Sequence, residues 1–123
     1  MIVLDTSVLV DALTGSRRSA PSLREAIERG ERILLPTLVL YEWLRGPRFP
    51  QEIETQEALF PRAEALAFGP EESSLAARLY RSLPRPRGRE IDLAIAAHAL
   101  AREAALWTLD RADFDDIPDL SLW

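Results

Sequence analysis

The sequence contains no cysteine, no lysine and no asparagine, and its only histidine is His98. The lack of cysteine excludes disulfide bonds, thiolate zinc sites and cysteine nucleophiles, and it agrees with a reducing compartment. Any metal site must therefore use oxygen ligands or His98. No apolar run approaches the roughly 20 residues that span a bilayer, and no basic segment followed by a long apolar one begins the chain. We expect a cytoplasmic protein that does not bind membranes.

Because lysine is absent, all 15 basic residues are arginine, and the formal net charge is −5. Such a chain is not a general nucleic-acid coat, because non-specific affinity comes from neutralising phosphates. A function on nucleic acid would need a local arginine cluster or a bound cation. The length of 123 residues predicts a single domain, 1–123, with one core that needs no disulfide bonds.

Short apolar runs alternate with amphipathic segments along the whole chain. Strands are expected at 2–4, 32–36, 64–68, 105–109 and 120–123, and helices at 6–13, 21–29, 37–45, 51–59, 71–83 and 90–103. Because strands alternate with helices, the pattern predicts an α/β fold, a three-layer α/β/α sandwich around a mostly parallel sheet.

Four acidic residues lie in apolar surroundings. Asp5 follows "IVL" and Asp110 follows "LWTL", so both fall at the carboxyl ends of expected strands, the edge where open α/β sheets bind ligands. Glu42 is the only charged residue in 33–44, and Asp92 lies in the first turn of an alanine-rich helix. If the four converge, like charges about 4 Å apart repel by about 4 kcal/mol per pair at a dielectric of about 20. A cation would relieve this repulsion, and oxygen ligands favour Mg²⁺ or Mn²⁺.

Each of these acids also has a structural explanation. Asp5 could cap the next helix, and Asp92 could offset a helix dipole. Glu42 could pair with Arg45, and Asp110 could begin an Asx turn. The metal site is favoured because the four acids come from four separate segments.

Four motifs occur in a familiar order: "VLDTSVLVD", "LVLYEWLRG", "IDLAIAAHAL" and "LWTLDRADFDDIP". In order and spacing they resemble PIN-domain ribonucleases, especially the VapC-type toxins of bacterial and archaeal toxin–antitoxin pairs, over nearly the whole chain. The resemblance implies a PIN-like fold and a Mg²⁺- or Mn²⁺-dependent endoribonuclease acting on RNA. It also implies a homodimer and an antitoxin that covers the acidic site.

The acidic quartet of that family falls on Asp5, Glu42, Asp92 and Asp110. The resemblance implies that Asp5 and Asp92 are the principal metal ligands, with the other two completing the site directly or through water. Ser7 resembles the small hydroxyl residue that often supports the metal site. The family often has asparagine at the last position and aspartate three residues later, so Asp113 is the alternative fourth acid.

Other residues carry weaker predictions. Arg85, Arg87 and Arg89, in the loop "PRPRGR" just before Asp92, could steer RNA phosphates, or they could form a solvated basic loop. His98 is expected to have a packing or surface role rather than a catalytic one. Exposed apolar side chains are expected around Trp43 and Leu44 and on the helix at 71–83, which also suggests a homodimer.

Two rival functions need residues that the sequence lacks. A haloacid-dehalogenase-like phosphohydrolase needs a second aspartate two residues after the first, and Thr6 and Ser7 follow Asp5 instead. A receiver-type signalling module would need a late lysine. A housekeeping RNA-processing PIN nuclease shares all four acids, and a catalytically inactive metal-binding or protein-interaction domain also remains open.

Overall fold

The computed structural model describes all residues, 1–123. The chain begins with strand β1 (Ile2–Leu4) and passes directly into helix α1 (Thr6–Leu13). The other regular elements are α2 (Ala20–Glu28), β2 (Ile33–Leu34), α3 (Thr37–Arg45), α4 (Pro50–Leu59), α5 (Pro70–Ser82), α6 (Glu90–Ala101) and β3 (Ala105–Trp107), with short 3₁₀ helices η1 (Arg62–Glu64) and η2 (Arg111–Asp113). The alternation of strands and helices expected from the sequence is confirmed.

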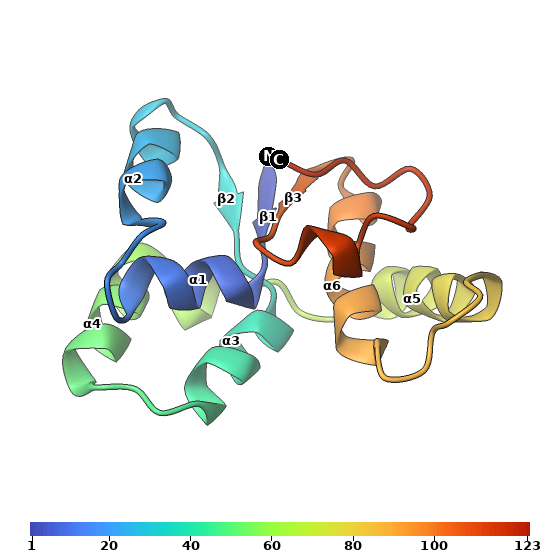
Figure 1. The fold of residues 1–123 in the computed structure, drawn as a ribbon, viewed down its shortest axis with the longest axis horizontal. Coiled ribbons are helices and arrows are strands. Elements are labelled where there is room, and N and C mark those ends of the chain that lie inside the picture. Colours follow the sequence, from blue (N-terminus) through green and yellow to red (C-terminus); the bar gives the residue numbers. More distant parts are fainter.

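The three strands form one parallel sheet in the order β2-β1-β3 (Figure 1). In the register, Ile2 lies opposite Ile33 and Ala105, and Leu4 lies opposite Trp107. Helices α1 to α4 gather on one side of the sheet, and α5 and α6 gather on the other (Figure 1). This arrangement confirms the three-layer α/β/α sandwich. Because all three strands run the same way, the residues that follow β1 and β3 meet at one edge.

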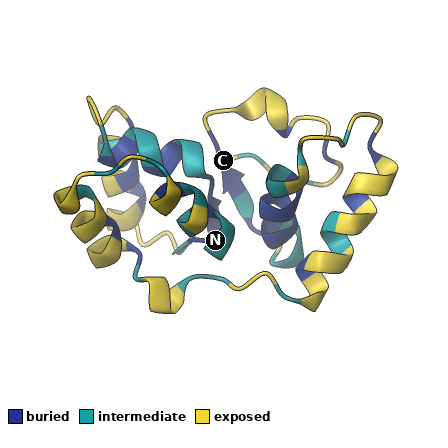
Figure 2. Cartoon of the chain, turned by 90° about the horizontal axis from the view of Figure 1, so that it is seen from below, coloured by how far each residue is buried: buried dark blue, intermediate teal, exposed yellow.

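The core explains why this edge is well defined. All three residues of β1 are buried, and α6 contributes buried small residues such as Ala96 and Ala99, which allow the helix to pack closely on the sheet. Buried residues line the strands and the inner faces of the helices, while exposed residues lie on the outer faces (Figure 2). None of the helices combines the length and apolar character required to cross a membrane.

Two expected strands are wrong. Segments 64–68 and 120–123 each form only an isolated bridge, between Pro36 and Leu66 and between Leu106 and Leu122. In the first segment, η1 ends at Glu64 and Pro70 already begins α5, so little chain is left to pair. Two hydrogen bonds make this bridge. The Leu66 amide donates to the Leu35 carbonyl at 2.9 Å, and the Leu66 carbonyl accepts from the Thr37 amide at 2.9 Å.

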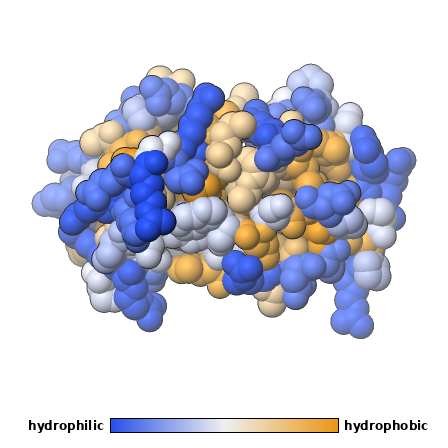
Figure 3. Space-filling model, turned by 90° about the horizontal axis from the view of Figure 1, so that it is seen from above, coloured by the Kyte–Doolittle hydropathy of each residue, from blue (hydrophilic) through white to orange (hydrophobic).

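Trp43 itself is fully buried beneath the guanidinium of Arg48, 4.3 Å from the ring centroid, and the apolar exposure expected around it falls on other side chains. Leu44 and Tyr41 on the same helix are exposed, and so is Phe49 just before α4. Figure 3 shows the side of the molecule that carries both termini, where apolar surface in the middle is bordered by hydrophilic surface. Large apolar side chains are therefore exposed both on this side and on α3.

Candidate active site

Asp5 lies where β1 gives way to α1, and only 4% of it is exposed. It occupies the N-cap position of α1, but its carboxylate makes no capping hydrogen bond. Instead its Oδ2 atom accepts hydrogen bonds from the hydroxyls of Ser7 and Thr108, both at 2.8 Å. The Oδ1 atom accepts no hydrogen bond from the protein and is not fully buried. The capping explanation therefore does not describe this carboxylate, which keeps one oxygen free.

Ser7 and Thr108 join the end of β3 to the start of α1. The Leu109 amide donates to the Ser7 hydroxyl, and the Asp110 amide donates to the Thr108 hydroxyl, both at 3.0 Å. Sequence reasoning identified Ser7 but missed Thr108, which is 3% exposed. The only signal for Thr108 was a hydroxyl at the end of an apolar strand, two residues before an acid.

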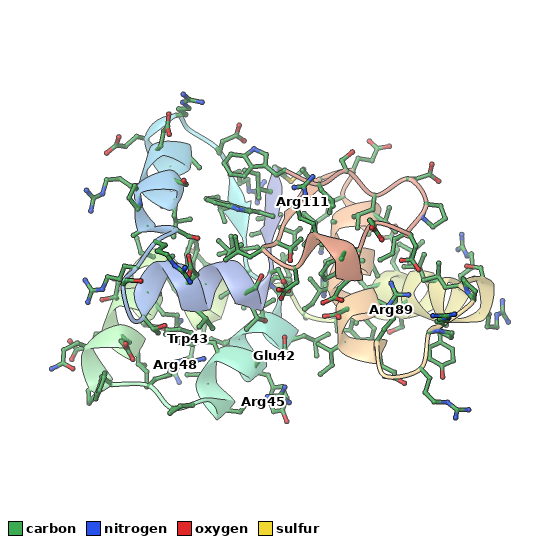
Figure 4. All side chains as sticks on the ribbon, viewed as in Figure 1. Glu42, Trp43, Arg45, Arg48, Arg89 and Arg111 are labelled. Carbon is green, nitrogen blue, oxygen red and sulfur yellow. The ribbon has the colours of Figure 1, made fainter.

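Glu42 reaches the same region from α3 (Figure 4). Its Oε1 atom accepts a hydrogen bond from the Thr6 hydroxyl at 2.6 Å, which ties α3 to α1. Its Oε2 atom accepts a longer bond, 3.3 Å, from Arg45. The pairing with Arg45 expected as the structural alternative is thus present, but the shorter contact links Glu42 to the residue beside Asp5. Sequence reasoning missed the role of Thr6.

Asp92 stands in the first turn of α6 and makes no hydrogen bond to the protein. Burial, and after it the neighbouring charges of Asp5, Asp113 and Glu42, together raise the pKa of Asp92 from its usual 3.8 to about 6. Arg89 acts in the opposite direction. The pKa of Asp110 is likewise raised by burial and by Asp5 and Asp113. These shifts indicate a cluster of carboxylates that repel one another.

All four acids predicted from the sequence line a single pocket of about 550 Å³ at the carboxyl edge of the sheet. Only two of its 13 lining residues are hydrophobic, Val10 and Leu109. Beyond the acids, the pocket continues along α1 to Arg18, its only basic lining residue. The pocket is therefore polar, and its charged residues are five acids and one cation at the far end.

The remaining predicted residues lie outside this pocket. Asp113 is exposed in η2, from where its charge acts on Asp92 and Asp110. Arg85 and Arg87 are exposed in the loop before α6, whereas Arg89 is half-buried and bound to Asp116. His98 is fully buried beside Glu72 and Arg102 at the interface of α5 and α6, which agrees with a packing role.

The donor set suits a hard divalent cation, although no three acidic or histidine side chains stand close enough to form a ready-made cage. Mg²⁺ commonly binds through one or two carboxylates and keeps several waters, so a complete cage is not required. Asp5 offers a free Oδ1 atom, and Asp92 has no protein partner for either oxygen. A cation would also relieve the repulsion that raises the pKa of Asp92.

Comparison with known proteins places the chain in context. The model of the PIN domain family matches residues 2–120. The chain is 34% identical to proteins named Ribonuclease VapC19 from two Mycobacterium tuberculosis strains, CDC 1551 / Oshkosh and H37Rv. Each alignment covers 98% of this chain and 97% of the relative.

Solved structures share the fold at lower identity. VapBC from Salmonella typhimurium, solved bound to DNA, aligns with a TM-score of 0.80 at 18% identity, covering 99% of this chain and 96% of that one. FitAcB from Neisseria gonorrhoeae aligns with a TM-score of 0.74 at 21% identity, covering 100% and 96%. VapBC2 from Rickettsia felis, also bound to DNA, gives 0.73 at 23% identity, covering 100% and 98%.

Proposed function

Because the chain belongs to the PIN domain family, we propose that it is a Mg²⁺- or Mn²⁺-dependent endoribonuclease and the toxin of a type II toxin–antitoxin pair. The observation that carries the proposal is the single pocket lined by Asp5, Glu42, Asp92 and Asp110, two of which have raised pKa values. The relative named as a ribonuclease supports RNA as the substrate. The toxin–antitoxin complexes among the structural neighbours support an antitoxin partner.

The proposed roles follow from the contacts. Asp5 and Asp92 hold the ion, and Asp110 and Glu42 complete the site directly or through water. When bound, the ion offsets phosphate charge and makes a coordinated water a better nucleophile. Ser7 fixes the Asp5 carboxylate so that its Oδ1 atom stays available. A carboxylate that does not bind the ion directly accepts the proton of the attacking water.

We expect the purified protein to cut RNA only when Mg²⁺ or Mn²⁺ is present. The measurement is gel analysis of a structured RNA with either ion, with EDTA, and with EDTA followed by excess metal. Asp5→Asn should abolish cleavage because it removes a charged ligand, while Glu54→Gln, an exposed acid on α4, should cut like wild type. Cleavage that persists in EDTA or in Asp5→Asn would contradict the proposal.

Growth distinguishes a toxin from a housekeeping RNA-processing nuclease. A toxin should arrest growth on induction in the cytoplasm, and co-expression of a small neighbouring gene should relieve the arrest. Asp5→Asn should be harmless when expressed to the same level. Normal growth with active wild-type protein would favour the housekeeping role.

We also propose a homodimer. Tyr41, Leu44 and Phe49, on and just after α3, expose 55%, 46% and 72% of their surface, and exposed large apolar side chains are candidates for a protein interface. A second copy would cover them with the same patch about a two-fold axis. Light scattering at micromolar concentration should give twice the mass of one chain, and Leu44→Glu should lower it. A monomeric wild type would refute the dimer.

A further inference from the structure

Arg89 connects two parts of the chain that carry separate acids of the site. It stands at the start of α6, three residues before Asp92, and reaches the loop after β3 (Figure 4). Its Nη1 and Nη2 atoms donate to the two carboxylate oxygens of Asp116, at 2.9 and 2.6 Å. Nη2 also donates to the Asp113 carbonyl at 2.9 Å, and Nη1 to the Arg85 carbonyl at 3.3 Å. These four bonds use the donors that an RNA phosphate would need.

The loop at 110–116 has few other ties to α6. Phe114 anchors it in the core, as does Ile117 just beyond it, with 1% and 4% exposed. The only side-chain hydrogen bonds between this loop and the start of α6 come from Arg89. The loop contains Asp110, which lines the pocket, and η2, whose Asp113 acts on Asp92.

Arg89 is also the cation among these carboxylates. Its hydrogen bonds to Asp116, and then the charges of Asp116, Asp92 and Asp113, raise its pKa. Without the guanidinium, Asp113 and Asp116 would meet the acidic start of α6 uncompensated, and repulsion would push the loop away. Arginine suits this position because its planar fork binds a carboxylate through two parallel bonds.

We infer that Arg89 is a positioning residue: it clamps the acidic loop at 110–116 to the start of α6 and so sets the spacing of Asp110 and Asp92 across the pocket. The consequence for cleavage rests on the proposed function, whereas the clamp itself does not. Arg89 therefore acts within the protein and does not bind RNA phosphates, the role that the sequence had suggested for it.

The test compares Arg89→Met with Arg29→Met. Arg29 also binds a carboxylate at 2.6 Å, that of Glu25, but far from the pocket, on α2. The first measurement is amide hydrogen exchange in metal-free protein at Asp113, Phe114 and Ile117, whose amides donate to carbonyls within the loop. Arg89→Met should speed this exchange roughly tenfold, because the loop opens more often, and Arg29→Met should leave it unchanged.

The second measurement separates positioning from phosphate binding. Arg89→Met should weaken Mn²⁺ binding and lower kcat on RNA by roughly tenfold each, with little change in KM, because the outer contacts of a metal site typically contribute about this much. Arg89→Lys should recover part of both, because it keeps the charge but loses the fork. Asp116→Ala should give a smaller loss, and adding it to Arg89→Met should change little further.

If amide hydrogen exchange in the loop is the same in Arg89→Met as in wild type, the inference that Arg89 clamps the loop is wrong. A raised KM and a weaker salt dependence, with kcat and Mn²⁺ binding intact, would instead assign Arg89 to RNA phosphates. If wild-type protein binds Mn²⁺ but cuts no RNA, the proposed function is wrong. Amide hydrogen exchange and Mn²⁺ affinity of the variants would still test whether Arg89 holds the loop in place.

Discussion

Asp92→Asn should abolish RNA cleavage while leaving the metal-free protein at least as stable as wild type. Asp92 makes no hydrogen bond that Asn would lose, and burial and neighbouring acids disfavour its charge. Removing that charge therefore relieves repulsion. The Asp92 carboxylate is also a proposed direct metal ligand. Its loss should therefore reduce cleavage by at least about a hundredfold, more than the 10–100-fold loss that is typical when a supporting residue is removed.

The measurement is thermal melting with and without millimolar Mn²⁺, alongside the cleavage assay. Wild type should gain stability from the ion by mass action, and Asp92→Asn should lose most of that gain. If Asp92 only offset the dipole of α6, the metal-free mutant would melt lower, by roughly 0.3–1 kcal/mol, and would still respond to Mn²⁺ and cut RNA. That combination would contradict its assignment as a ligand.

The pH dependence of the same pair sharpens this prediction. Because folding raises the pKa of Asp92 from 3.8 to about 6, its proton stabilises the folded metal-free protein at low pH, and this stabilisation is lost as the pH rises through about 6. Wild type and Asp92→Asn should melt alike near about pH 4, and wild type should melt lower near about pH 7. Mn²⁺ affinity of wild type should fall as the pH drops below about 6, because protons compete for the carboxylate. A pH-independent difference in melting would contradict the raised pKa.

Thr108→Val should lower Mn²⁺ affinity or kcat by roughly 10–100-fold, although it replaces none of the proposed metal ligands. Valine has nearly the shape of threonine, so the change removes only the hydroxyl that donates to Asp5 and accepts from the Asp110 amide. Both acids then lose a fixed orientation. We also expect the free energy of unfolding to fall by about 1–3 kcal/mol, because buried groups lose a hydrogen-bond partner.

Two variants control this experiment. Thr108→Ser keeps the hydroxyl and should stay near wild type. Thr55→Val removes an exposed hydroxyl that bonds to the Gln51 carbonyl on α4, and it should change neither activity nor metal affinity. If Thr108→Val bound Mn²⁺ and cut RNA normally, the hydroxyl pair would not position Asp5.

The sequence singles out three of the four acids that line the pocket because each of the three contradicts its local pattern. Asp5 and Asp110 follow apolar strands, and Glu42 interrupts an apolar helix face, so each is conspicuous without knowledge of the fold. The parallel sheet then brings the strand ends to one edge, as the alternation of elements predicts. What stays a prediction is the chemical role of each carboxylate.

The supporting contacts escape sequence reasoning because they depend on tertiary proximity. Thr108 lies 103 positions from Asp5, and Asp116 lies 27 positions from Arg89. A hydroxyl at a strand end and an arginine in a proline-rich loop are common surface features, and nothing local distinguishes these two. The same limit affected segments 64–68 and 120–123, where apolar residues indicated strands but only single bridges form.

The central claim is that carboxylate-held metal activates water to cut RNA, and the ends of the cleaved RNA test it most directly. Under single-turnover conditions with Mn²⁺, attack by water predicts fragments that carry an ordinary terminal phosphate monoester and no cyclic phosphate. The fragments can be analysed by mass spectrometry, with Asp5→Asn run in parallel to exclude contaminating nuclease. Fragments ending in a 2′,3′-cyclic phosphate would show that the ribose hydroxyl attacks instead, and would contradict the account.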